Sequence, residues 1–411
     1  MATKALAAPP AGVAGSSTLR NFKSQISNFN SPAGDLLLAA LLVSTLPGFA
    51  QAPSTPYAVI PHDAVNYSGP GRDADRDLAG TEIKIGLLVP LTGSHAEEGK
   101  ALLQAAELAI EDEAASPLPE GRRVSIVPRD QSGLWGRASN EIVRLVYEDR
   151  AVAIVTSLDG GSAHLAEQVG NKVGIPIVTL STDPTTTQIN LPWIFRLGPT
   201  DAQQARAFAR DIYGARKLKQ VILITEIGHD GRVGGEQFEK AARELNAPPI
   251  IQLAIDPGDW NPDSVASQIV AERPEALVFW TGRETTTRLV PRIHRAFPAA
   301  PVYLCREAAQ GRLDTGQENT WIVSPRLAGS PLRESFERRY RARAGTIPAP
   351  AAAQAYDAVR LLAAALRRSG PNRARLRDAL AALSSYTGVS GVISFDHAGN
   401  DLSDVTLVRL P

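Results

Sequence analysis

The chain has 411 residues, more than one ordinary domain holds, so two or more compact units are expected. Hydrophobic residues make up 44% and charged residues 21% of the sequence, as in soluble globular proteins. Lys and Arg together number 43, and so do Asp and Glu, which argues against nucleic acid or an anionic membrane as the main partner. The single cysteine, Cys305, excludes an internal disulfide and any metal site built from several cysteines.

The N-terminal region predicts export. Residues 36–43 form a short apolar run, followed by a Pro-Gly pair and then Ala50-Gln51-Ala52. Because a bilayer span takes about 20 apolar residues, we interpret residues 1–52 as a signal peptide cleaved after Ala52. The alternatives are a short buried helix or a membrane anchor. Residues 53–80 have no apolar pattern and are interpreted as a flexible leader.

Strands and helices alternate in the next hundred residues. Apolar runs predict buried parallel strands, and most are followed by a helix with apolar residues on one side. The predicted strands are residues 82–90, 124–128, 152–156 and 174–179, and the predicted helices are residues 99–114, 137–147 and 163–172. This series predicts an α/β fold with a parallel, doubly wound sheet.

The segment 191–204 marks the passage to a second α/β lobe. Residues 193–197 predict a strand, and Thr200 or Asp201 can cap the helix that follows. Further strands are predicted at residues 221–225, 250–255, 276–280, 302–304 and 320–323, with helices at residues 235–245, 264–271 and 285–297. Two lobes joined in mid-chain make a cleft, and clefts are where ligands bind.

The last part of the chain changes character. Helices are predicted at residues 332–344, 351–369 and 373–383, and closing strands at residues 391–395 and 405–409.

Five segments resemble the type I periplasmic solute-binding proteins, in particular the branched-chain amino acid (Leu/Ile/Val-binding) receptors of ABC importers. The segments are residues 86–93 (GLLVPLTG), 174–178 (GIPIV), 195–204 (FRLGPTDAQQ), 356–362 (YDAVRLL) and 389–396 (VSGVISFD). The resemblance covers residues 81–409 and implies two Rossmann-like lobes joined by three hinge crossings. It implies a first lobe of residues 81–199 and 328–388, and a second lobe of residues 200–327 and 389–411.

The resemblance also implies where a ligand binds. In doubly wound sheets, ligands lie beyond the carboxyl ends of the strands, where helix N-termini offer unpaired N–H groups. In the family, two loops that match residues 157–162 and 179–183 hold the carboxylate and ammonium of an amino acid. The residues expected to contact the ligand are Glu98, Trp135, Ser157, Asp159, Ser162, Ser181 and Thr182 from the first lobe, and Arg283 and Glu307 from the second.

Seven of these nine residues have a simpler alternative role. Ser181, Thr182 and Asp159 can cap helices, and Glu98 can be a solvated carboxylate at a helix start. Arg283 and Glu307 can pair with each other, and Trp135 can pack in the core. Because charged residues replace several of the family's residues, a polar or charged ligand has at least as much support as leucine.

We therefore expect a periplasmic, monomeric receptor, without cofactor or metal, that captures a small polar solute such as an amino acid. It would deliver this solute to the membrane permease of an ABC importer. A sensory receptor of the same fold, reporting to a signalling partner, is the alternative. A hydrolase is a third and weaker reading, because residues 160–164 approach the nucleophile-elbow pattern but end in His where the pattern has Gly.

Overall fold

The computed structural model describes Leu78 and residues 80–132, 135–188, 191–248, 250–310, 319–325, 330–403 and 405–410. The side chain of Trp135 lies outside this description. The predicted signal peptide and nearly all of the predicted leader also lie outside the described residues.

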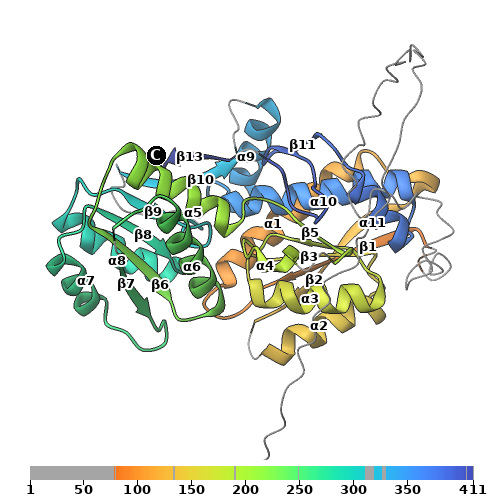
Figure 1. Ribbon diagram of the computed structural model, residues 1–411. Helices are drawn as coiled ribbons and strands as arrows, with labels where there is room; N and C mark the ends of the chain where they lie inside the picture. Colours follow the sequence, from red (N-terminus) through yellow and green to blue (C-terminus); the bar gives the residue numbers. More distant parts are fainter. Residues whose placement is uncertain are drawn as a thin grey trace, which may run out of the picture. The chain divides into compact units, whose positions relative to one another are not determined.

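The first sheet has five parallel strands in the order β2-β1-β3-β4-β5 (Figure 1). They are β1 (Glu82–Val89), β2 (Arg123–Asp130), β3 (Ala153–Thr156), β4 (Ile177–Thr179) and β5 (Ile194–Arg196). The connections contain α1 (Ala96–Ala114), the 3-10 turn η2 (Pro119–Gly121), α2 (Trp135–Tyr147), α3 (Gly160–Val173) and α4 (Thr185–Gln188). The apolar run of β1 is explained by burial, since Ile85, Leu87 and Leu88 are fully buried.

The second sheet has six strands in the order β13-β10-β9-β8-β6-β7, and β13 runs antiparallel to its neighbour. The strands are β6 (Val221–Glu226), β7 (Ile251–Ile255), β8 (Ala276–Trp280), β9 (Val302–Leu304), β10 (Thr320–Pro325) and β13 (Val405–Arg409). The helices are α5 (Asp201–Ala209), which continues as the π-helix η3 (Arg210–Ala215), α6 (His229–Glu244), α7 (Pro262–Ala271) and α8 (Arg283–Ala296). We call each sheet, with the helices packed on it, a lobe. The predicted α/β fold with two doubly wound lobes is confirmed.

The C-terminal helices return to the first lobe. They are α9 (Pro331–Ala344), α10 (Pro350–Ser369) and α11 (Arg373–Ala381), and α10 packs along α1. Two short strands, β11 (Tyr386–Thr387) and β12 (Val392–Ile393), then pair antiparallel. Val389, Ile393 and Phe395 belong to the core of the first lobe, so this core extends past residue 388, where the sequence predicts the chain to leave it.

Several helices begin earlier than the sequence predicts, and three of these starts lie next to the cavity described below. α3 starts at Gly160, α6 at His229 and α8 at Arg283, so residues expected in loops form first helical turns. Glycine has a low helix propensity, and the starts of α3 and α6 are rich in it, which hides both helices from a pattern of apolar residues.

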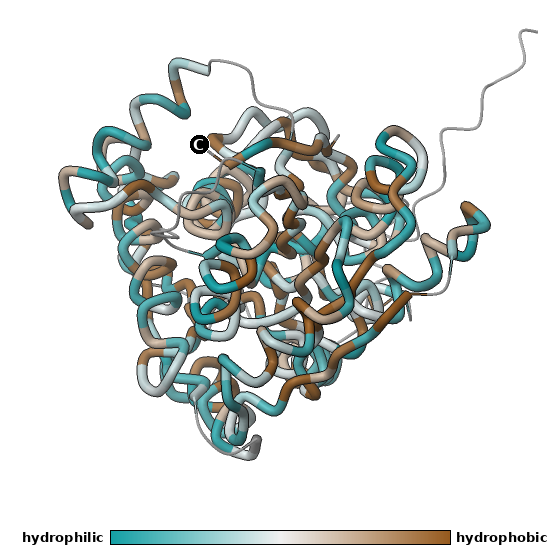
Figure 2. The backbone as a smooth tube through the Cα atoms, turned by 90° about the vertical axis from the view of Figure 1, so that its left-hand side faces the viewer, coloured by the Kyte–Doolittle hydropathy of each residue, from teal (hydrophilic) through white to brown (hydrophobic). Residues whose placement is uncertain are grey.

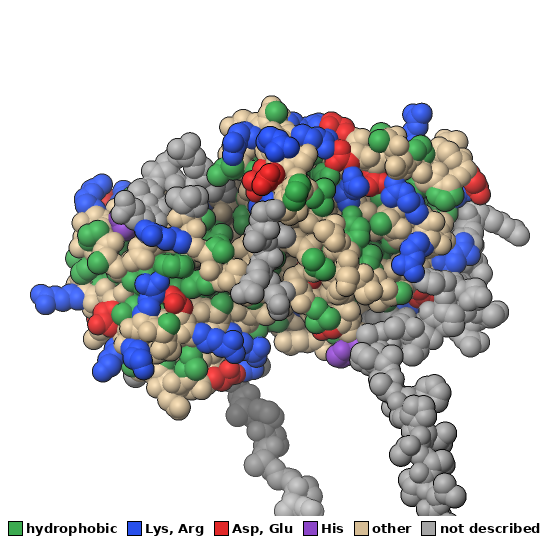
Figure 3. Space-filling view, turned by 90° about the horizontal axis from the view of Figure 1, so that it is seen from above, with side chains coloured by type: hydrophobic (Ala, Val, Ile, Leu, Met, Phe, Trp, Pro, Cys, Tyr) green, Lys and Arg blue, Asp and Glu red, His purple; other side chains and the backbone are tan. Residues whose placement is uncertain are grey.

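The distribution of polarity agrees with a globular protein. Hydrophobic and hydrophilic residues alternate along the helices in Figure 2, as expected where one side of a helix faces a core. On the face in Figure 3, basic and acidic side chains lie interspersed rather than separated by sign. Within the described part of the chain, no helix combines the length and the apolar character needed to cross a membrane.

Candidate functional site

A cavity of about 490 Å³ opens between the two lobes. Its walls are the loops that follow β1, β2 and β3 in the first lobe and β6, β8 and β9 in the second. These loops stand at the carboxyl ends of parallel strands, where doubly wound sheets bind their ligands. The volume lies within the range of about 300–1,000 Å³ that is usual for small-molecule sites.

Most of the ionisable side chains that line this cavity are carboxylates. They are Glu98 and Asp159 from the first lobe, and Glu226, Asp230 and Glu307 from the second. Among the described lining residues there is no Lys or Arg, and the ionisable bases are His95 and His229. We call these five acids the carboxylate ring. A ring of this kind repels anions and attracts a cation.

Repulsion and burial change the ionisation of the carboxylate ring. Burial, followed by the charge of Glu98, raises the pKa of Glu307 to about 8. Burial and then the charge of Glu307 raise the pKa of Asp230 well above its usual value. His95 lies between two ring members, with Nδ1 3.7 Å from Glu98 and 4.0 Å from Glu307. The interaction with Glu98 is the main reason why the pKa of His95 rises to about 9.

The N-terminus of α3 directs its N–H groups at the protein's own carboxylates. Asp159 accepts from the Ser162 N–H at 2.8 Å, and both oxygens of Asp230 accept from the Gly160 N–H at 3.2 Å. Asp230 belongs to α6, so the second bond joins the two lobes. A Cβ atom on Gly160 would lie 2.4 Å from Asp230 Oδ1, so glycine leaves room for this carboxylate in its present position. The resemblance implies a ligand carboxylate at this loop, but here the protein supplies the anion itself.

Five of the residues expected to contact a ligand line the cavity. They are Glu98, Ser157, Asp159, Ser162 and Glu307. Two of them also have structural partners. The Ser157 hydroxyl donates to Gln131 at 3.0 Å, and Asp159 caps α3, as its simpler alternative predicts.

Three other expected residues do not line the cavity, and their contact with a ligand stays a prediction. Ser181 is buried, and its hydroxyl accepts from the Asp183 N–H at 3.2 Å. The Thr182 carbonyl accepts from the Asp201 N–H at 2.7 Å, so this turn leads into α5 instead of facing the cavity. Arg283 begins α8 and lines an adjoining groove. Trp135 begins α2, and its side chain lies outside the described part of the chain.

The lining residues that the sequence analysis missed include His95, Gln131, Glu226, Asp230 and Trp280. Glu226 accepts from the Gly282 N–H at 3.0 Å and from the Thr285 hydroxyl at 2.6 Å. Trp280 donates from Nε1 to Asp201 at 3.0 Å. Both Glu226 and Trp280 end strands of the second sheet, so their position at the carboxyl ends of predicted strands was a usable signal.

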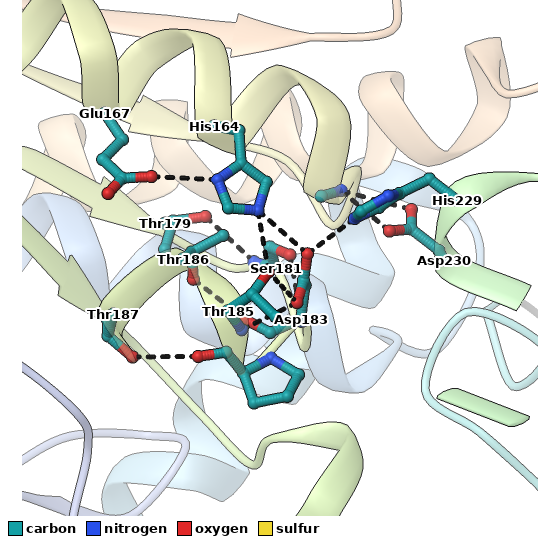
Figure 4. A network of polar contacts seen from close by, with 12 residues as sticks. His164, Glu167, Thr179, Ser181, Asp183, Thr185, Thr186, Thr187, His229 and Asp230 are labelled. Atoms are coloured by element: carbon teal, nitrogen blue, oxygen red, sulfur yellow. Dashed lines mark hydrogen bonds and ion pairs between the residues drawn. The ribbon is translucent and has the colours of Figure 1, made fainter. Parts of the chain in front are cut away.

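A second cluster of charged groups joins the lobes beside the cavity (Figure 4). His164 Nε2 lies 3.1 Å and His229 Nε2 2.7 Å from the same oxygen, Asp183 Oδ2. His164 Nδ1 lies 3.0 Å from Glu167 Oε2. Hydrogen bonds to Asp183 and Glu167 raise the pKa of His164 to about 9. Burial opposes ionisation of Asp183, but its hydrogen bonds from both histidines hold its pKa well below the usual range.

The connections between the lobes are held by a buried arginine. Arg196 ends β5, is 1% exposed and forms a parallel bridge with Asn400 of the last connection. Its guanidinium donates to the Thr186 hydroxyl at 3.1 Å, and also to the Asp183 carbonyl, the Thr187 hydroxyl and the Asn400 side-chain oxygen. We call this group the hinge network.

Comparisons with known proteins agree with this architecture. A family model described as periplasmic binding protein matches residues 82–409. An amino acid binding protein of Pseudomonas aeruginosa is 27% identical over 203 residues, which are 48% of this chain and 53% of that protein. A Leu/Ile/Val-binding protein of Rhizobium johnstonii is 26% identical over 206 residues, which are 49% of this chain and 55% of that protein. The chain thus spans about half the length of these curated relatives.

A solved structure extends the likeness to nearly the whole fold. A solute-binding protein of an ABC transporter from R. palustris, in complex with benzoate, superposes with a TM-score of 0.73 at 20% identity. The match covers 80% of this chain and 93% of that protein. At this identity the likeness concerns the fold, so the solute has to be argued from the cavity.

Proposed function

The chain belongs to the periplasmic binding proteins, as its motifs predict, and we propose that it captures a small, positively charged solute between its lobes. The solute is an amino acid with a basic side chain or a related amine, and the protein delivers it to an ABC importer. The observation that carries this proposal is the carboxylate ring, which has no Lys or Arg beside it among the described lining residues.

The charge of the solute follows from what the empty cavity lacks. Buried carboxylates that outnumber their counter-charges are costly, and here part of the cost appears as the raised pKa of Glu307, in spite of the nearby His95. A positive group on the solute would supply the missing charge. A solute carboxylate would meet α3 N–H groups that already donate to Asp159 and Asp230. These two facts together favour a net positive solute over leucine or an aromatic acid.

The mechanism proposed is closure of the two lobes around the solute. Carboxylates from both lobes line the cavity, so a bound cation attracts both walls and favours the arrangement in which they are close. Glu98 and Asp159 would hold the solute from the first lobe, and Glu226 and Glu307 from the second.

Export, the permease partner and the monomeric state remain part of the proposal. Export rests on the predicted signal peptide at residues 1–52, and the permease on membership of the family. The predicted division into residues 81–199 with 328–388 and residues 200–327 with 389–411 stays the proposed pair of moving lobes, except that Val389, Ile393 and Phe395 pack in the core of the first lobe. A membrane permease would then recognise the closed form.

A thermal-shift screen of the purified chain tests the proposal. A ligand that binds the folded state stabilises it by about 2.7 kcal/mol at a concentration 100 times its Kd. We expect L-lysine, L-arginine or putrescine to raise the Tm, and L-leucine, L-glutamate and benzoate to leave it unchanged. A shift with leucine or benzoate alone would overturn the proposed charge of the solute. Chemical conversion of the bound solute would favour the hydrolase instead of the receptor.

A further inference from the structure

The histidine cluster beside the cavity has the geometry of a metal site. The ligand atoms offered by His164, Asp183 and His229 all lie within 4.8 Å of one another. Two of the separations, 3.1 Å and 2.7 Å, are already close to the roughly 3.3 Å expected between neighbouring ligands of tetrahedral Zn²⁺ with bonds of about 2.0–2.1 Å. Small side-chain movements therefore suffice to place all three donors around one ion.

The hydrogen-bond pattern also favours a cation at this point. Nε2 of His164 and Nε2 of His229 both face Asp183 Oδ2. Each of these two contacts needs either a hydrogen-bonding proton or a metal cation between the nitrogen and the oxygen. Figure 4 shows the two imidazoles approaching Asp183 from different elements. In the metal-free protein, protons occupy these positions. One metal ion, bound to all three groups, can replace both protons.

The surroundings supply the outer partners that metal-binding histidines have. A histidine ligand usually donates its second ring N–H to a carboxylate, which fixes the ring and raises its basicity. Glu167, which is 2% exposed, lies 3.0 Å from His164 Nδ1 and fits that role. The Thr185 hydroxyl, 2.9 Å from His164 Nε2, can complete the coordination or hold a water there.

The cluster is open to an ion from solvent. The side chains of His164 and His229 are 28% and 39% exposed, while that of Asp183 is 1% exposed. A metal ion from solvent can therefore reach the two imidazoles first and the buried carboxylate of Asp183 behind them. Imidazole nitrogen suits Zn²⁺, Ni²⁺, Cu²⁺ and Fe²⁺, whereas Ca²⁺ and Mg²⁺ prefer oxygen ligands.

From these observations we propose that His164, Asp183 and His229 bind one divalent transition-metal ion, such as Zn²⁺, and that this ion joins the two lobes. His164 belongs to α3 and Asp183 follows β4, both in the first lobe, whereas His229 begins α6 in the second. An ion bound to all three stabilises the closed arrangement whether or not a solute is present. The proposal does not depend on the identity of the solute.

Calorimetric titration of the full chain with ZnCl₂ alone tests the site, with an absorption spectrum of the Co²⁺ form to report the ligands. We expect one ion per chain and intense visible Co²⁺ bands of four- or five-coordination. His229→Ala should weaken binding at least 100-fold, and Glu167→Gln about tenfold. His397→Ala, which removes an exposed histidine from a turn, is the matched control and should change nothing.

At His164 the test uses a substitution other than alanine, because alanine would remove the hydrogen-bond partner of the buried Glu167. His164→Gln can keep that hydrogen bond and should still lose the ion, while the Tm of the metal-free variant stays near that of the parent. Equal zinc binding by the parent, His229→Ala and His164→Gln would overturn the site.

Amide exchange tests whether the ion joins the lobes. The Gly160 N–H donates across the cavity to Asp230, so Zn²⁺ should slow exchange of peptides containing Gly160 in the parent and not in His229→Ala. Stoichiometric zinc binding with unchanged exchange would overturn the bridge between the lobes.

Discussion

The hinge network and the carboxylate ring both place charges at the junction of the two lobes, but they satisfy them differently. Around Arg196, one buried cation is surrounded by oxygen atoms from Asp183, Thr186, Thr187 and Asn400. In the ring, five carboxylates share a cavity without Lys or Arg among its described lining residues. In the first group the cation is held by oxygen atoms of the protein itself, whereas in the second the carboxylates outnumber the histidine cation, His95, so a solute can provide a further positive charge.

The difference separates structural from functional charge. A buried charge with all its partners in the chain contributes to a fixed geometry, because removing either side leaves an uncompensated group. A buried cluster of like charges destabilises the empty site, and a ligand of opposite sign regains that free energy on binding. Stability should therefore depend on the hinge network, and affinity on the carboxylate ring.

The largest expected effect is the loss of stability when the hinge network is removed. Arg196→Ala should lower the free energy of unfolding by about 3–5 kcal/mol, because several buried oxygen atoms lose their donor. Urea unfolding followed by circular dichroism measures the change. The control is Arg206→Ala, which removes an exposed arginine from α5. A loss below about 1 kcal/mol would mean that the hinge network does not hold the connections together.

A substitution between the lobes tests the proposed closure next. Gly160→Ala places a Cβ 2.4 Å from Asp230 Oδ1, so the Asp230 side chain has to move and its bond from the Gly160 N–H, which joins the lobes, is disturbed. We expect affinity for the best cationic solute of the thermal-shift screen to fall at least about tenfold, which is 1.4 kcal/mol. Calorimetry measures the affinity. Gly136→Ala in α2, where no atom would crowd the added Cβ, should leave the affinity unchanged.

The fold could be predicted because its signals are local and repeated. Apolar runs separated by helical patterns identify the strands, and Gly86–Gly93 and residues 195–204 carry the family resemblance. The cavity was harder to predict because its acids come from loops far apart in sequence. Glu98 and Glu307 were identified through the resemblance, whereas Glu226 was missed because a carboxylate after a strand has no pattern of its own.

The sequence was least informative where a side chain had two possible directions. Ser181 and Thr182 sit in the expected loop, yet the turn directs them to Asp183 and toward α5. Arg283 is one turn of backbone from Trp280 and still faces an adjoining groove, because α8 begins at that residue. Such choices depend on tertiary packing, which a single sequence does not record.

The raised pKa values in the carboxylate ring predict that the affinity for a cationic solute depends on pH. The pKa of Glu307 is raised to about 8 in the empty protein, and a bound cation favours its ionised form. Binding at pH 7 should therefore release a proton, and the affinity for a cationic solute should rise from pH 6 to pH 8.5. Calorimetry in buffers of different ionisation enthalpy measures the released proton.

Glu307→Gln sharpens this prediction. The variant should bind the cationic solute about fivefold more weakly at pH 7, since part of the attraction is already offset by the cost of ionising the acid. Its affinity should change less between pH 6 and pH 8.5 than that of the parent. An unchanged slope would assign the released proton to another group and would remove Glu307 from the proposed contacts.

The smallest expected effect concerns the cation that the ring already contains. The pKa of His95 is raised from 6.5 to about 9, so its charged form stabilises the folded state fully below pH 6.5. That contribution is lost as the pH rises through about 9. Because the His95 side chain is 48% exposed, solvent screening limits the contribution to about 0.5–1 kcal/mol.

His95→Gln should therefore lower the free energy of unfolding at pH 6 and make little difference at pH 10, as measured by urea unfolding at both values. The matched variant His397→Gln, on an exposed turn, should show no such change between the two pH values. If His95→Gln were neutral at pH 6, the carboxylates around it would not hold a cation in the empty protein. The same urea unfolding measurement on Glu226→Gln, whose carboxylate also raises the pKa of His95, would then show whether this ring member holds a cation.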